Sequence, residues 1–220
     1  MSTLKLYFAP GACSFVPHSL LEVAGAAFEP VLVKLHKQEN LGAEFKAINP
    51  RGQVPVLVDG DQVLTQIVAI VTLLDAKFPQ MGFLPQAPIQ RARVLETLAW
   101  MNNTAHPAFT HVFMPFKFTD DAAAQAAVKR YNAQLFKGML GEIEQMALQM
   151  RAGGRAFLFG DRFGPVDAYA LTLLRWGGFA GHDPQQFPAL WSHVQALAQL
   201  PAVARAIERE RLQLNVYQAA

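Results

Sequence analysis

The only cysteine of the 220 residues lies within the stretch Tyr7-Phe8-Ala9-Pro10-Gly11-Ala12-Cys13-Ser14-Phe15-Val16-Pro17-His18. The apolar residues 4–8 predict a buried strand, and Pro10-Gly11 predicts a turn directly after it. An apolar helical pattern then begins at Phe15. We therefore expect Cys13 at the point where a strand turns into a helix.

The position of Cys13 allows two interpretations. At a helix N-terminus, unpaired N–H groups and the positive end of the macrodipole favour an anion, so a thiol there should lose its proton more easily than a free thiol. Alternatively, Cys13 is a small, buried, apolar residue. Position alone does not decide between a reactive and a structural cysteine.

The composition bounds the class of protein. Apolar residues make up 52% and charged residues 16% of the chain, which is ample for a hydrophobic core, and the net charge of +2 is too small to predict a nucleic-acid or membrane surface. A single cysteine excludes an internal disulfide and a multi-cysteine metal site. With no signal-peptide pattern and no apolar run long enough to span a bilayer, we expect a cytoplasmic protein.

The first 80 residues predict a small α/β unit in the order βαβαββα. The strand before Cys13, the helix after it and a β-branched run at residues 31–35 form a strand–helix–strand unit, whose strands should pair in parallel. The further predicted elements are a short helix at 43–48, a hairpin with strands at 56–58 and 62–64, and a helix at 66–77 capped by Thr65.

The rest of the chain predicts helices only. Residues 80–89 contain two prolines and a glycine and are the best linker candidate, so we expect domains at 1–82 and 90–220. The predicted helices are 90–112 with a kink at Pro107, 119–150 with Thr119 as cap, 165 to the Gly177-Gly178 pair, 187–200, and a last one from Pro201.

Three separated motifs point to one family. They are Pro10-Gly11-Ala12-Cys13-Ser14 followed by Pro17-His18, then Asn49-Pro50-Arg51-Gly52-Gln53-Val54-Pro55, and Asp167 two residues after Pro165. In this order they resemble the glutathione transferase family over essentially the whole chain, most closely its bacterial cysteine-containing (beta) class. The resemblance implies a thioredoxin-like domain followed by an all-helical domain. It also makes Asp167 a buried helix-start aspartate with only half a capping box, because Gly164 replaces the usual Ser or Thr.

The resemblance implies that glutathione is a co-substrate. In the family the proline matching Pro55 is cis, and the backbone of the preceding residue, here Val54, pairs with the cysteinyl part of glutathione like an added strand. The class's cysteine, here Cys13, faces the glutathione sulfur, and His106 matches a histidine that points toward the thiol. Ser14 has the location of the catalytic serine of other classes. The resemblance also places at glutathione Lys37, Gln53, Gln66, Ile67 and, in trans across a homodimer, Asn103.

The chain departs from the family pattern at three places. Phe8 replaces the tyrosine before the proline turn, and Pro107 replaces a lysine found in some members. The pair Gln66-Ile67 replaces an acidic or amide residue followed by serine, which in the family bind the γ-glutamyl end of glutathione. A lost hydrogen bond to a charged group costs about 1.5–3 kcal/mol, so we expect glutathione to bind about tenfold to a hundredfold more weakly.

Several hypotheses for the function remain open. The first is an enzyme that conjugates glutathione to small hydrophobic electrophiles, a detoxification reaction, or carries out glutathione-dependent thiol–disulfide exchange through Cys13, without a metal. The second is a non-catalytic binding or structural protein of the same fold, and a third is an enzyme with another acidic or thiol substrate. An apolar second-substrate pocket would be lined by five aromatic residues that could equally be core residues: Trp100, Phe109, Phe113, Phe116 and Trp176.

Overall fold

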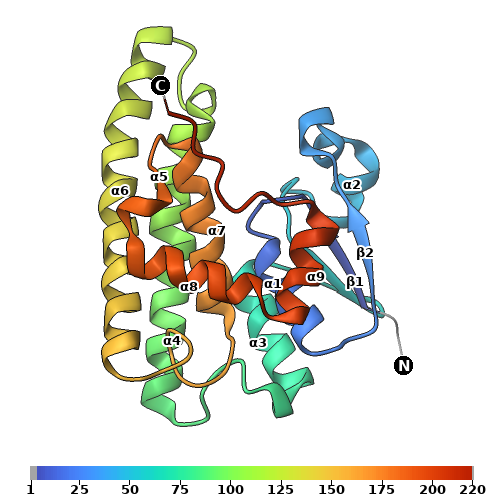
Figure 1. The fold of residues 1–220 in the computed structure, drawn as a ribbon. Helices are drawn as coiled ribbons and strands as arrows, with labels where there is room; N and C mark the ends of the chain where they lie inside the picture. The colour runs from blue at the N-terminus through green and yellow to red at the C-terminus, as the bar shows by residue number, and fades with distance from the viewer. Residues whose placement is uncertain (1–3, 220) are drawn as a thin grey trace.

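The computed structural model describes residues 4–219, which form a mixed sheet flanked by helices and a larger helical part (Figure 1). The sheet holds β1 (Leu4–Phe8), β2 (Phe28–Leu32), β3 (Val56–Asp59) and β4 (Gln62–Thr65) in the order β2-β1-β3-β4. β1 pairs in parallel with β2, whereas β3 is antiparallel to both β1 and β4. The predicted thioredoxin-like arrangement is confirmed.

The second strand lies three residues earlier than predicted. Phe28 pairs with Leu4 and Leu32 with Phe8, while Leu35 already begins a short 3-10 turn, Leu35–Lys37. Pro30 is tolerated because β2 is an edge strand, where a missing ladder donor faces no further strand. The β-branched residues 31–35 thus marked the end of the strand and the loop beyond it.

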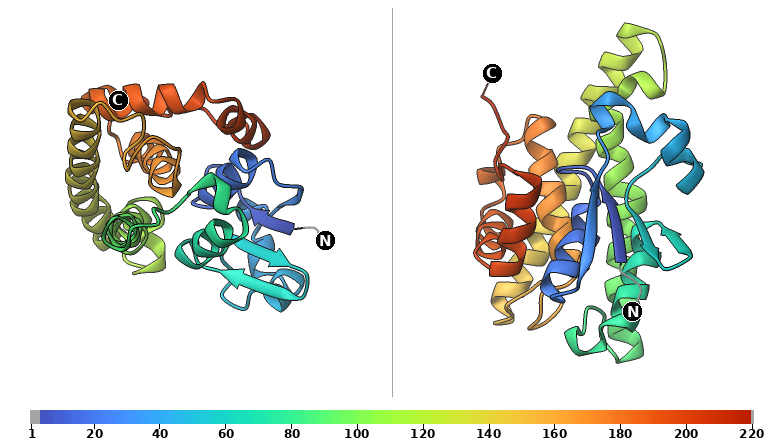
Figure 2. Two further views of the ribbon diagram at one scale, coloured as in Figure 1. Left: turned by 90° about the horizontal axis from the view of Figure 1, so that it is seen from below. Right: turned by 90° about the vertical axis from the view of Figure 1, so that its right-hand side faces the viewer.

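Helices cover both faces of the sheet. The helices α1 (Phe15–Val23) and α3 (Ile67–Lys77) pack on the face that carries Phe8, while α2 (Ala43–Ile48) covers the face that carries Tyr7 (Figure 2). The expected alternation of Tyr7 and Phe8 is therefore present. α3 begins at Ile67, one residue later than predicted, and Thr65 does not cap it, because Thr65 is still paired with Val56 in the hairpin.

The second part of the chain is helical, as predicted. Its helices are α4 (Pro88–Trp100), α5 (His106–Phe113), α6 (Ala122–Ala152), α7 (Pro165–Phe179), α8 (Pro188–Ala198) and α9 (Pro201–Glu210). Short 3-10 turns occupy Glu39–Leu41, Pro79–Met81, Pro115–Lys117 and Pro184–Gln186. α9 packs against α1 of the sheet domain, so the last helix and the first lie side by side (Figure 1). The domain limits at 82 and 90 stay a prediction.

The helix predicted at 90–112 begins at Pro88 and ends at Phe113, and a π-helical turn, Met101–Ala105, interrupts it just before Pro107. Two other expectations about helix ends need correction. Asp121, not Thr119, caps α6 and accepts a hydrogen bond from the Ala124 N–H at 2.6 Å.

The glycines predicted to stop α7 lie inside it. A Cβ on Gly177 would come within 2.8 Å of Leu140 Cδ1, and one on Gly178 within 2.7 Å of the Tyr217 nitrogen. These two glycines therefore allow α6 and the C-terminal segment to approach α7, and the helix continues to Phe179. Glycine here reflects close packing and not a helix end.

Asp167 organises the start of α7. Its buried carboxylate accepts hydrogen bonds from the backbone N–H groups of Leu158 and Gly164, both at 3.0 Å, and lies 2.8 Å from Nε2 of His193. Gly164 has no side chain to return the bond, so the half capping box expected from the sequence is present. Since three polar groups, two of them buried, depend on this one carboxylate, it joins α7, α8 and the loop before α7.

We predict that Asp167→Ala lowers the free energy of unfolding by about 3–5 kcal/mol, because the buried N–H of Leu158, the half-buried N–H of Gly164 and the buried His193 lose their partner. Urea denaturation measures the difference. The matched change Asp120→Ala, at an exposed aspartate, should stay within about 0.5 kcal/mol of the unmodified protein. Equal losses in the two variants would contradict a structural role for Asp167.

Candidate functional site

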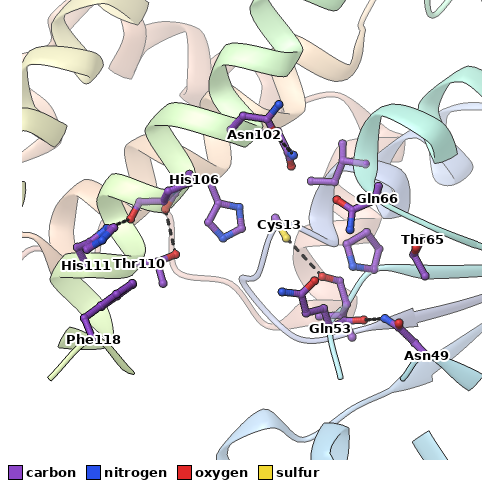
Figure 3. A pocket seen from close by; sticks show the side chains of 15 residues that line it. Cys13, Asn49, Gln53, Thr65, Gln66, Asn102, His106, Thr110, His111 and Phe118 are labelled. Atoms are coloured by element: carbon purple, nitrogen blue, oxygen red, sulfur yellow. Dashed lines mark hydrogen bonds between the residues drawn. The ribbon is translucent and has the colours of Figure 1, made fainter. Parts of the chain in front are cut away.

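A cavity of about 480 Å³ lies where the sheet domain meets the junction of α4 and α5 (Figure 3). One side is formed by residues of the sheet domain and the other by residues of the helical part. Its lining comprises Cys13, Asn49, Gln53, Val54, Pro55, Thr65, Gln66, Ile67, Asn102, Asn103, His106, Pro107, Thr110, His111 and Phe118. Most residues that the sequence placed at a glutathione site are therefore gathered around one opening.

The loop that carries Cys13 is held from the far end of the chain. The Gly11 N–H donates to Oε2 of Glu210 at 2.8 Å, and the Gly11 carbonyl accepts from Nε1 of Trp176 at 2.8 Å. Gly11 has φ 69, and a Cβ there would lie 2.5 Å from the Arg175 guanidinium. His18 is fully buried, with Nδ1 2.7 Å from Oε1 of Glu210. The motif histidine thus helps to anchor the loop and lies outside the cavity.

Ser14 does not reach the cavity. Its hydroxyl accepts from the Ala9 N–H at 3.1 Å and donates to the Ala9 carbonyl at 3.2 Å, and the residue is fully buried. These two bonds close the loop between β1 and α1. Ser14 occupies the N-cap position of α1, yet its side chain makes no capping bond. The structure therefore gives Ser14 a role in the shape of the loop.

Cys13 is a protonated thiol. It is only 7% exposed, and its Sγ donates to the Val54 carbonyl at 3.6 Å. Burial raises the pKa of Cys13 to about 12, although the backbone N–H groups of Cys13 and Ser14 act in the opposite direction. The expectation that a helix N-terminus would make this thiol more acidic is wrong, because desolvation of the thiolate outweighs the nearby donors.

The segment before β3 presents its backbone to the cavity. The Val54–Pro55 peptide bond is cis, as the resemblance implied. Asn49 holds this segment, since its Nδ2 donates to the Gln53 carbonyl at 2.7 Å. The Val54 carbonyl accepts from Cys13, and Figure 3 shows the neighbouring Gln53 close to the thiol.

His106 lines the cavity opposite Val54 as a neutral imidazole. Its Nδ1 lies 2.8 Å from the hydroxyl of Tyr169, and its ring meets that of Trp176 at 4.7 Å. Burial, together with the positive charge of Lys117, lowers the pKa of His106 to about 4. His106 therefore brings no positive charge to the thiol, and among the described hydrogen bonds none joins it to Cys13.

Sequence reasoning missed a polar network behind His106. The Tyr169 hydroxyl donates to Oδ1 of Asn102 at 3.3 Å, and Nδ2 of Asn102 donates to Oδ1 of Asn103 at 2.8 Å. A signal was present, because Tyr169 is a hydroxyl-bearing residue within a strongly apolar helix, and a buried tyrosine usually needs a partner. Its partner could not be named without knowing which helix faces α7.

The remaining predicted residues divide between the cavity and the surface. Gln66, Ile67 and Asn103 line the cavity, and Asn103 does so from the same chain as Cys13. Lys37 lies on an exposed 3-10 turn and is not part of the lining.

The five candidate aromatic residues do not line the cavity either. Phe109 and Trp176 are buried and stack at 4.6 Å, Trp100 packs against the core, and Phe113 and Phe116 are 52% and 60% exposed. Phe109, Trp176 and Trp100 are therefore core residues, as the alternative interpretation stated. Residues that the sequence did not single out form much of the lining instead, notably Thr110, His111 and Phe118.

Two further properties concern the described residues as a whole. Within residues 4–219 no three His, Cys, Asp or Glu side chains are grouped so that they could hold a metal ion. None of the helices described is both long and apolar enough to cross a membrane.

Comparison with known proteins matches both parts of the chain to the same family. Residues 2–76 match the family model for the glutathione S-transferase N-terminal domain, and residues 101–201 that for the C-terminal domain. Glutathione S-transferase GstA of Escherichia coli O157:H7 is 33% identical over 215 residues, which cover 95% of this chain and 100% of the relative.

Two solved structures are similar over the same length. A sphingomonad glutathione S-transferase complexed with glutathione has a TM-score of 0.79 at 32% identity, covering 95% of this chain and 100% of the other. The beta-class glutathione S-transferase of Sphingomonas chungbukensis has a TM-score of 0.80 at 30% identity, with the same coverage.

We predict that Cys13 resists alkylation at ordinary pH. Because the raised pKa keeps the thiol protonated, iodoacetamide at about pH 8 should modify the folded protein more than about a hundredfold more slowly than the same thiol in urea. The rate should still be rising at about pH 10. Mass spectrometry follows this single cysteine directly, and a plateau near neutral pH would contradict the protonated thiol.

Proposed function

Because the chain belongs to the glutathione S-transferase family, we propose that it conjugates glutathione to an electrophile. Named glutathione S-transferases that match over most of the chain support this reaction. The observation that carries the proposal is that Cys13, the cis Val54–Pro55 segment and His106 line one cavity, where burial raises the pKa of the thiol and lowers that of the imidazole. This pair favours conjugation over thiol–disulfide exchange, which needs a thiolate on the attacking cysteine.

In the proposed complex, glutathione lies along the segment before β3. Its cysteinyl part pairs with the backbone of Val54, beside Gln53 and the cis Pro55, so that its sulfur comes close to Cys13. The γ-glutamyl carboxylate lies at the start of α3, where Gln66 and Ile67 line the cavity and the first helical N–H groups favour an anion. This geometry needs no serine at position 67, though it makes fewer polar contacts than one with serine.

The proposed role of Cys13 is that of a hydrogen-bond donor. In the free protein its S–H donates to the Val54 carbonyl. When the glutathione sulfur approaches, the same S–H can turn toward it and stabilise the glutathione thiolate, with the backbone N–H groups of the loop nearby. The thiolate then attacks the electrophilic carbon, a C–S bond forms, and the displaced electron pair leaves with the leaving group or moves onto the electrophile.

His106 would act as an uncharged polar group near the sulfur. With a pKa of about 4 it is neutral at the pH of the reaction and does not lower the pKa of the glutathione thiol by charge. Its Nδ1 is held by Tyr169, which fixes the ring against α7. His106 would therefore position the ligand and take no part in forming the thiolate.

The resemblance also supports finer proposals about the state of the protein. We propose a cytoplasmic homodimer that uses glutathione as its co-substrate and needs no metal. Ser14 and Lys37 are left out of the proposed contacts, because Ser14 closes its own loop and Lys37 lies on the surface. The role proposed for Cys13 depends on its S–H group, which acts as the hydrogen-bond donor to the glutathione sulfur.

We predict that Cys13→Ser and Cys13→Ala differ in activity. Serine keeps a hydrogen-bond donor, so kcat/KM for conjugation should stay within about threefold of the unmodified enzyme, whereas alanine should lower it about tenfold. The assay is glutathione conjugation to an aryl halide, with glutathione binding measured by calorimetric titration.

The two variants also separate conjugation from exchange. If Cys13 worked through a mixed disulfide, serine would be as inactive as alanine, and reduction of hydroxyethyl disulfide would be the dominant activity of the unmodified protein. Absence of glutathione binding at millimolar concentration would contradict the proposed function as a whole.

A further inference from the structure

The segment before β3 presents the backbone of one residue to the cavity. Val54 precedes the strand Val56–Asp59, and none of the hydrogen bonds described for residues 4–219 uses its N–H group. Its carbonyl accepts one of them, from Sγ of Cys13 at 3.6 Å. Both backbone groups of Val54 thus lie outside the sheet ladder, where an extended peptide can pair with them as with a strand edge.

Three successive carbonyls of this segment accept hydrogen bonds from side chains. Nδ2 of Asn40 donates to the Gly52 carbonyl at 2.7 Å. Nδ2 of Asn49 donates to the Gln53 carbonyl, also at 2.7 Å, and Figure 3 shows this second bond. The third carbonyl, that of Val54, accepts from the buried thiol, which is a weak donor compared with an amide. Of these three hydrogen bonds, the one to Val54 is therefore the easiest for a ligand to replace.

Replacing this bond leaves the S–H group in need of another acceptor. Cys13 is only 7% exposed and its thiol is protonated, so a displaced S–H meets little water. A ligand that brings a sulfur atom to the same place supplies the missing acceptor. A thiolate is the better acceptor of the two, because a hydrogen bond to a charged group is stronger than one to a carbonyl.

We propose that the Val54 carbonyl holds the proton of Cys13 in the free protein and releases it when an N–H group of the thiol substrate takes its place. This proposal rests on the conjugation proposed above. No covalent bond changes in the exchange: a peptide N–H replaces the S–H at the carbonyl, and the S–H turns to the substrate sulfur. The substrate thus orients the donor that stabilises its own thiolate.

The exchange selects thiols by their backbone. Glutathione carries an amide N–H on the α-carbon of its cysteinyl part, one CH₂ group away from the sulfur. A thiol without that N–H leaves Cys13 bound to the Val54 carbonyl, so its sulfur gains no donor. Loss of the N–H should therefore lower kcat, whereas loss of a contact that only binds the substrate would raise KM and leave kcat unchanged.

Infrared spectroscopy tests the exchange directly, because Cys13 is the only thiol in the chain. The probe is γ-glutamyl-aminobutyryl-glycine, which has the backbone of glutathione and a methyl group in place of the thiol. At saturation we expect the S–H stretching band to move to higher frequency, since the S–H has lost its acceptor. The matched probe, with an ester oxygen in place of the aminobutyryl N–H, should leave the band near its position in the free protein. Cys13→Ala assigns the band by removing it.

Kinetics test the consequence for the reaction. The substrates are glutathione and its analogue with an ester oxygen in place of the cysteinyl N–H. In the unmodified enzyme the ester should lower kcat about threefold to tenfold and change Kd little, because the N–H only replaces an existing hydrogen bond. In Cys13→Ala the Val54 carbonyl starts without that bond, so the ester should weaken binding by a similar factor and leave kcat nearly unchanged. Calorimetric titration measures Kd.

Each other outcome contradicts a specific statement. A band that stays in place although calorimetry shows binding of the sulfur-free peptide would overturn the exchange while conjugation stands. An equal fall of kcat with the ester in both proteins would do the same. Absence of binding of both glutathione and the sulfur-free peptide at millimolar concentration would overturn the proposed function, and the exchange with it.

Discussion

The buried carboxylate of Glu210 is the interaction on which the site depends. It accepts from the Gly11 N–H with one oxygen and lies against His18 with the other, and so ties the last residue of α9 to the loop of Cys13. Burying a carboxylate is costly unless it is fully partnered, so this geometry leaves the loop little freedom. Arg205 reinforces the same contact by pairing with Glu22 at the end of α1. The loop of Cys13 is therefore held in place by the C-terminal helix as well as by the sheet domain.

The rigid loop also explains the chemistry of Cys13. Two effects compete there: nearby backbone N–H groups favour the thiolate, and burial between the loop and Val54 disfavours it. Burial is the larger effect, and the negative charge of Glu210, which holds the loop from behind, raises the pKa of the thiol further. The acidity of this cysteine is therefore a property of the whole fold and not of its helix.

Local sequence patterns predicted the elements well and their partners poorly. The strand–turn–helix around Cys13, the hairpin and the succession of helices follow from periodicity, proline and glycine, and the motifs placed Cys13, Val54, Gln66 and His106 at one cavity. Some failures were local, such as the cap of α6, where Asp121 takes the place expected for Thr119. Others concern contacts between distant residues. The pattern predicted a helix stop at Gly177 because its close contact with Leu140 on α6 cannot be read from the sequence, and the hydrogen bond between His106 and Tyr169 was missed for the same reason.

The side chains described around the cavity carry little charge of their own. Cys13 and His106 are both neutral near pH 7, and the lining described includes no Asp, Glu, Lys or Arg, although the positive charge of Lys117 lies close enough to act on His106. A negatively charged ligand therefore meets mainly dipoles of the protein, which act most strongly on a charge that lies close to them. The start of α3 and the loop N–H groups are dipoles of this kind. Selectivity in this site would then depend on where the ligand develops negative charge, more than on how much apolar surface it buries.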